Sequence, residues 1–204
     1  QPPLSRVRLK ARLAMLDAED AAVVQEIDAL LGWINHPMEK SDAEIVAHAH
    51  TLLERLHTPL LRELVAFRLE VRTLVAALRR RGRGEGPPAR REPWGYGRWL
   101  AQIQRYWREP GFRLDGMFPW LGEANRLLGE GDALGLERLL LRVIWEHLER
   151  ARAGHDFDLE AVVIYVLRWD IIDRCTRYGA APAEQRFSAL IERGLGEYDR
   201  LFAA

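Results

Sequence analysis

The sequence predicts an all-α protein of roughly eight or nine helices in two packed helical bundles joined by an Arg/Gly/Pro-rich linker. Apolar residues recur with helical spacing along most of the 204-residue chain, and capping residues stand where such segments begin. One run, LRRRGRGEGPPARREPWGYG from Leu78 to Gly97, interrupts this pattern, because its glycines and prolines cannot sustain a helix. We therefore expect an N-terminal bundle over residues 1–81, a linker over 82–93 and a C-terminal bundle over 94–204, which can also pack as one domain.

Four helices are predicted before the linker. The first covers residues 4–15 with one apolar face, and Asp17 can cap the second. The motif SDAE at Ser41 is a capping box, in which hydroxyl and carboxylate bind free backbone amides, and it begins the third. Thr58 followed by proline is typical of a helix start. The helix over 59–81 is apolar around most of its circumference, which predicts a central helix with neighbours on several sides.

Five more helices are predicted after the linker, at about residues 97–109, 119–129, 133–154, 159–179 and 182–202. Asp132 and Asp158 are suitable N-caps for two long apolar helices among them. Gly179 is a suitable C-terminal stop, because glycine adopts the left-handed conformation that ends many helices. No segment gives a convincing strand pattern.

Charge, cysteine content and hydropathy limit the function classes. Thirty acidic and thirty basic residues give zero net charge, so any basic surface has to be local. Cys175 is the only cysteine, which excludes an intramolecular disulfide and a cysteine-rich zinc site and suits a reducing cytoplasm. The longest uninterrupted apolar run, 161–167, is far shorter than the roughly 20 residues of a membrane-spanning helix. We expect a cytoplasmic protein that reaches the inner membrane only through a complex.

The linker region is a candidate interaction surface. Its residues are Arg79, Arg80, Arg81, Arg83, Arg90, Arg91 and Trp94. The arginines can neutralise phosphates, and aromatic residues at Trp94, Tyr96 and Trp99 suit stacking of single-stranded bases. Alternatively the segment contacts a protein, or it is a solvated loop whose arginines favour the end of a helix dipole. Because Glu85 and Glu92 dilute the charge, we favour the solvated loop, with a protein contact second and no nucleic-acid partner.

A buried charge network is predicted between two apolar helices. Arg68 and Arg72 lie four residues apart on the predicted central helix, and Asp170 and Asp173 interrupt a helix that is apolar nearly all round. Buried charges have to pair with one another to offset the loss of water. We therefore expect at least one Arg–Asp pair that joins the two halves of the chain.

No catalytic, cofactor or metal site is predicted. His48 and His50 point in different directions on a helix, and the motif HDFD from His155 to Asp158 stands where a helix has to be capped. Cys175 has no histidine near in sequence, which favours a buried structural thiol. The glycines of GRGEGPP lack the Lys-Ser/Thr pair of a phosphate-binding loop.

Three stretches together resemble an uncharacterised bacterial family of helical proteins whose genes often lie within V-type (A/V-type) ATPase operons. They are LRELVAFRLEVRTLVAALRRRGRG at 61–84, FRLDGMFPWLGEANRLLGEGDALGLERLLLRVIWEHL at 112–148 and FDLEAVVIYVLRWDIIDR at 157–174. Members of that family begin with a short Tyr- and Leu-rich segment ending in Leu-Pro. This sequence begins QPPLSRVRLKARL, so the resemblance implies an N-terminal truncation.

The resemblance implies a non-enzymatic accessory or stalk-type subunit, similar to the C (or d) subunit that links the rotary stalk to the membrane ring. Its partners would be V-type ATPase subunits, and it would contact the membrane only through them, without a cofactor. In that role the linker is a hinge between bundles that can grip an acidic partner. Two alternatives stay open: a small helical enzyme with an unidentified Asp/His site, and an Arg-mediated nucleic-acid-binding module.

Overall fold

The part of the chain that the structure describes is folded into helices. The computed structural model describes residues 4–31, 42–89 and 92–176, and these contain eight helices and no strand. The all-α prediction is confirmed for these residues. The helix predicted at 182–202 and the capping serine of SDAE lie outside them.

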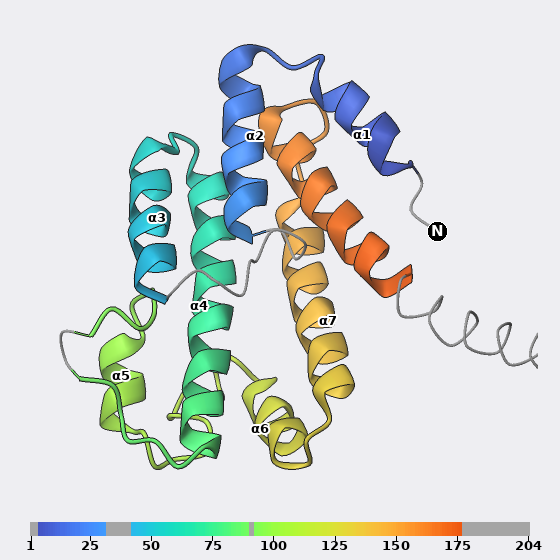
Figure 1. Cartoon of the computed structure of the whole chain (residues 1–204). Helices are drawn as coiled ribbons and strands as arrows, with labels where there is room; N and C mark the ends of the chain where they lie inside the picture. Colours follow the sequence, from blue (N-terminus) through green and yellow to red (C-terminus); the bar gives the residue numbers. More distant parts are fainter. Residues whose placement is uncertain (1–3, 32–41, 90–91, 177–204) are drawn as a thin grey trace, which may run out of the picture.

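The helices surround a long central one (Figure 1). The first four are α1 (Arg6–Leu13), α2 (Ala18–Leu31), α3 (Asp42–Arg55) and α4 (Pro59–Gly82). The others are α5 (Leu100–Arg105), α6 (Leu121–Gly129), α7 (Ala133–Ala151) and a last helix over residues 159–176. Helix α4 packs against α2, α3, α6 and α7, which come from both sides of the Arg/Gly/Pro-rich segment.

Two apolar clusters follow one another along α4. The first cluster contains residues of α1, α2, α3 and the part of α4 up to Leu69. It also contains residues from the end of α7 and from the last helix. The second begins at Val71 of α4 and includes α5, α6 and the first half of α7. Each cluster therefore draws residues from both sides of the linker, and the predicted arrangement of two bundles divided at 82–93 is not confirmed.

Most of the predicted caps bind as expected. The Asp17 carboxylate accepts a hydrogen bond from the Asp20 amide at 2.8 Å, and that of Asp132 accepts one from the Gly135 amide at 2.8 Å. Thr58 makes no side-chain cap bond, although the proline after it occupies the first helical position. Local sequence thus fixes several helix starts, because each cap satisfies an amide that has no partner inside its helix.

The helix predicted at 97–109 is shorter than expected, because a distant arginine binds the chain that follows it. Helix α5 ends at Arg105, and the Arg81 guanidinium donates hydrogen bonds to the carbonyls of Trp107, Glu109 and Pro110. The loop after α5 is thereby attached to the last turn of α4. Arg81 and the carbonyls that it binds are 26 to 29 positions apart in the sequence, so helical periodicity does not predict this contact.

We predict that Arg81→Ala lowers the free energy of unfolding by about 2 kcal/mol or more, since hydrogen bonds from a charged donor each contribute about 1.5–3 kcal/mol before solvent screening. The change also removes a 2.8 Å bond to Asn125 and the cation above the Phe112 ring. Urea unfolding measures the difference. Arg83→Ala is the control, since Arg83 pairs only with Glu85 at the exposed surface and such pairs contribute about 0–1 kcal/mol. Equal effects of the two changes would contradict the anchoring role of Arg81.

Candidate functional site

Within the predicted linker surface, several arginines are bound by the protein's own groups. Arg80 pairs with Glu85 at 3.0 Å and with Glu92 at 2.7 Å, and Arg83 pairs with Glu85 at 2.6 Å. The hydrogen bond from Arg80 lowers the pKa of Glu92. The two glutamates that dilute the charge in the sequence are therefore direct partners of its arginines. Fewer positive charges are left for an acidic partner than the sequence suggests.

The remaining members of that surface have different environments. Trp94 is only 4% exposed and belongs to the core, so it is not available to a partner in this structure. Arg81 anchors the loop after α5, and Arg79 is exposed. Arg90 and Arg91 lie outside the described residues.

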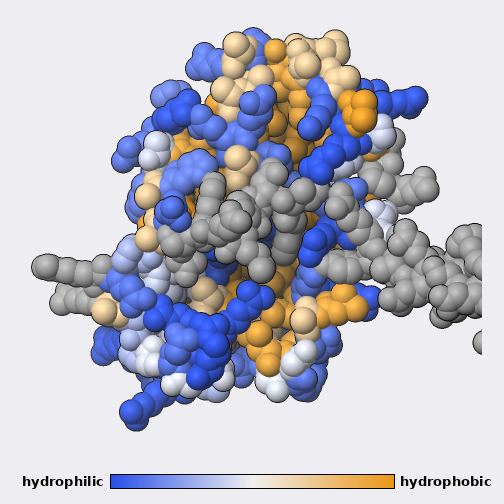
Figure 2. All heavy atoms as spheres, viewed as in Figure 1, coloured by the Kyte–Doolittle hydropathy of each residue, from blue (hydrophilic) through white to orange (hydrophobic). Residues whose placement is uncertain are grey.

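The outward face of α1 exposes both large apolar and basic side chains. Val7, near the start of this helix, is 78% exposed, and Met15, in the turn after the helix, is 84% exposed. Arg8, Lys10 and Arg12 are exposed between them, and α1 contains no acidic residue. We call these five residues the α1 face. Figure 2 shows exposed apolar residues at the end of the molecule where α1, α2 and the last helix meet.

The cations of the α1 face are not compensated by the described residues. No ion pair or cation–π contact links Arg8, Lys10 or Arg12 to any other residue within 4–31, 42–89 and 92–176. The inner side of α1 is held by the buried Leu9 and by a 2.8 Å hydrogen bond from Trp169 Nε1 to the Leu4 carbonyl. The helix is thus fixed in place with a basic and apolar face turned to solvent.

A cleft of about 420 Å³ lies between α1, α2 and the last helix. Its walls include Leu9, Leu13, Val24, Val166 and Trp169. Asp28 and Asp170 also line it, and their side chains are hydrogen-bonded to each other. Burial and the neighbouring Asp28 carboxyl raise the pKa of Asp170 to about 7, although the Arg6 charge opposes the rise. Asp170 therefore gains or loses its proton near neutral pH.

Two members of the predicted charge network, Arg68 and Asp170, interact electrostatically. Arg68 and Asp170 line the same small cavity between α4 and the last helix, and Arg68 Nη2 lies 3.5 Å from the Leu31 carbonyl. Burial and then Arg72 lower the pKa of Arg68 to about 10, while Asp170 opposes the fall. Asp173 also acts on Asp170, and it raises the pKa of that carboxyl.

The main partner of Asp170 was not predicted from the sequence. It is Asp28 on α2, which is a single acid on an amphipathic helix and gives no signal of its own. Only the packing of α2 against the last helix brings the two carboxyls together.

A second cleft, of about 540 Å³, lies along α4 between α3, α7 and the chain after the linker. It is lined by His50, Glu63, Glu70, Tyr96 and His147, among others. The His147 ring stacks on Phe67 at 3.7 Å, and burial lowers the pKa of His147. Burial also raises the pKa of Glu70. This grouping was not predicted, because its members come from four separate segments.

Comparisons of the chain with models of known families, with curated proteins and with solved structures give no match. Among the described helices, none is both long and apolar enough to cross a membrane.

We predict that Asp170→Asn makes the protein increasingly more stable than the wild type as pH rises from about 4 to about 7. In the folded wild type Asp170 keeps its proton up to about pH 7, whereas in the unfolded chain it loses the proton above its ordinary pKa of 3.8. Between these values rising pH lowers the free energy of unfolding of the wild type by up to about 1.4 kcal/mol per pH unit. Asparagine cannot ionise and lacks this penalty. Urea unfolding across this pH range measures the difference, with the exposed Asp156→Asn as control. A constant difference between variant and wild type would contradict the shared proton.

Proposed function

We propose that this protein is a non-enzymatic accessory subunit that acts through protein–protein contacts, with the α1 face as its docking surface. The observation that carries the proposal is the grouping of exposed Val7 and Met15 with three cations that no described acid compensates. A helix that is basic and apolar on its outward side fits a partner whose surface is acidic around an apolar centre.

The proposed partners are subunits of a bacterial V-type ATPase. The three stretches at 61–84, 112–148 and 157–174 that resemble the family from those operons support this assignment, and the all-helical fold is compatible with a stalk-type subunit. In this proposal the protein is cytoplasmic and lies at the inner membrane only through its partners. The α1 face, rather than the linker, grips the acidic partner.

We predict that V-type ATPase subunits co-purify with the tagged protein from its native host. Combining Arg8→Glu with Arg12→Glu should reduce the recovery of these subunits about tenfold or more. Reversing two charges at a complementary interface places like charges opposite each other. Mass spectrometry of the eluate measures the recovery. The matched control is Arg108→Glu with Arg138→Glu, two exposed arginines outside α1 that give the same change in charge.

The results separate the parts of the proposal. If the wild type brings down no ATPase subunit, the partner is wrong. If the control variant loses the subunits as fully as the α1 variant, the α1 face is not the docking surface. Tight, salt-dependent binding of single-stranded DNA by the purified protein would instead favour a nucleic-acid-binding module.

The cleft along α4 favours a second candidate function, that of a small helical enzyme. It places two histidines and two glutamates around one cavity, and burial shifts the pKa of Glu70 and of His147 toward neutral forms. Such groups suit proton transfer at a bound substrate. Hydrolysis of a test ester or phosphate that is lost in Glu70→Gln would support the enzyme, whereas the accessory role leaves partner recovery unchanged in that variant.

A further inference from the structure

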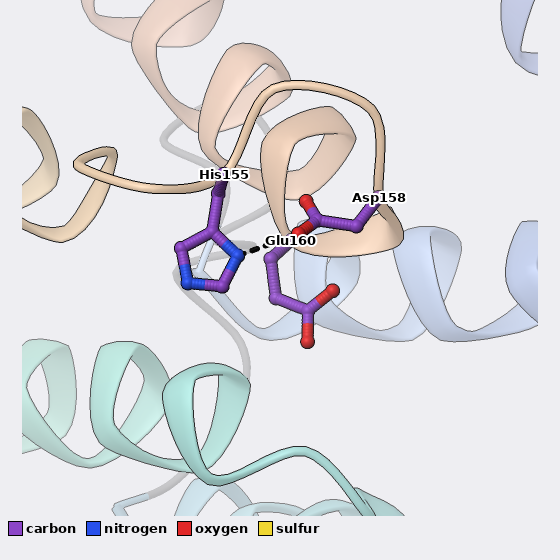
Figure 3. Close-up of side chains that lie close together, drawn as sticks. All are labelled: His155, Asp158 and Glu160. Atoms are coloured by element: carbon purple, nitrogen blue, oxygen red, sulfur yellow. Dashed lines mark hydrogen bonds and ion pairs between the residues drawn. The ribbon is translucent and has the colours of Figure 1, made fainter.

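The turn between α7 and the last helix gathers a histidine and two carboxylates (Figure 3). His155 Nδ1 lies 2.6 Å from Asp158 Oδ2. Glu160 follows on the first turn of the last helix, and one ligand atom from each of the three residues lies within 4.8 Å of the others. The other Asp158 oxygen caps the helix by accepting a 2.9 Å hydrogen bond from the Ala161 amide.

Glu160 is the unexplained member of this group. Glu160 is only 8% exposed, yet no hydrogen bond or ion pair joins its side chain to any residue that the structure describes. Its carboxylate oxygens are not among the fully buried side-chain atoms, so they keep some contact with solvent and can be reached by a cation. Glu160 therefore stands beside His155 and Asp158 with its coordinating capacity unused.

The surroundings of Glu160 add negative charge. Asp20, on the first turn of α2, lies within electrostatic reach of Glu160 and of its own neighbours Asp17 and Glu19. Helix α2 thus brings further carboxylates to the same end of the molecule as the turn at 152–158 (Figure 1). A cation at this place offsets repulsion that the acids otherwise exert on one another.

We propose that His155, Asp158 and Glu160 form a zinc-binding site, with a water molecule or a side chain of a partner as the fourth ligand. One imidazole and two carboxylates are a ligand set that zinc accepts, and the imidazole favours zinc over magnesium or calcium. The Ala161 amide binds one carboxylate oxygen of Asp158, and the other oxygen, Oδ2, faces His155.

Zinc binding requires the three ligand atoms, which lie within 4.8 Å of one another, to adopt a common spacing. Two ligand atoms about 2.0–2.1 Å from a tetrahedral zinc ion lie about 3.3 Å from each other, so the 2.6 Å pair of His155 and Asp158 has to open slightly. Asp158 can keep its cap bond through one oxygen and coordinate through the other. His155 and Asp156 also line a cleft of about 410 Å³, which gives an ion a route to the site from solvent.

Equilibrium dialysis of the tag-free full chain against zinc, followed by metal analysis, tests the site. We expect one bound zinc ion per chain, with an affinity about tenfold or more lower in Glu160→Gln and in His155→Ala, as is usual when groups that support a metal site are removed. Asp156→Asn is the matched control, an exposed acid in the same turn, and should bind zinc like the wild type.

A second measurement separates ligation from structural damage. Without metal, Glu160→Gln should melt at a higher temperature than the wild type, because the like-charge repulsion between Glu160 and Asp20 is gone. Added zinc should raise the melting temperature of the wild type more than that of the variant. Absence of zinc binding, or zinc binding that Glu160→Gln leaves unchanged, would overturn the proposal. So would binding of magnesium or calcium alone, because those ions have no use for His155.

Discussion

The burial of α4 on several sides is the constraint on which the rest of the fold depends. Ten of its 24 residues are buried, and all of these except Thr73 belong to one or the other of the two apolar clusters. A helix of this kind needs neighbours all round, and the chain supplies them from α2 and α3 before the linker and from α6 and α7 after it. Separating the two halves at the Arg/Gly/Pro-rich segment would therefore expose apolar surface of α4 to water.

Much of the fold was predictable from local sequence, and the parts that were not depend on distant contacts. Helical spacing and caps such as Asp132 identify most elements, because both are properties of neighbouring residues. The early end of α5 was not predictable, since it depends on Arg81, which lies more than twenty residues earlier. The partners of the linker arginines were not predictable for a similar reason. Sequence shows where arginines are concentrated, but not that Glu85 and Glu92 bind Arg80 in the folded chain.

The zero net charge of the chain conceals a separation of charge over its surface. The α1 face carries cations without acidic neighbours in its own helix. The starts of α2 and of the last helix carry acids, among them Asp20 and Glu160, and acids at helix N-termini are favoured by the helix dipole. A neutral protein can thus present a basic face to one partner and an acidic site to a cation. Summed composition reveals neither.

The hydrogen bond between Trp169 and the Leu4 carbonyl also governs how the protein is made. It joins residues 165 positions apart, and α1 has only one fully buried side chain of its own. During synthesis at about 5–20 residues per second, α1 leaves the ribosome roughly 10–30 seconds before the helix that holds it is translated. For that interval the inner side of α1 lacks the contacts that the last helix provides, among them the bond from Trp169. The nascent α1 segment is therefore open to chaperones before the last helix closes on it.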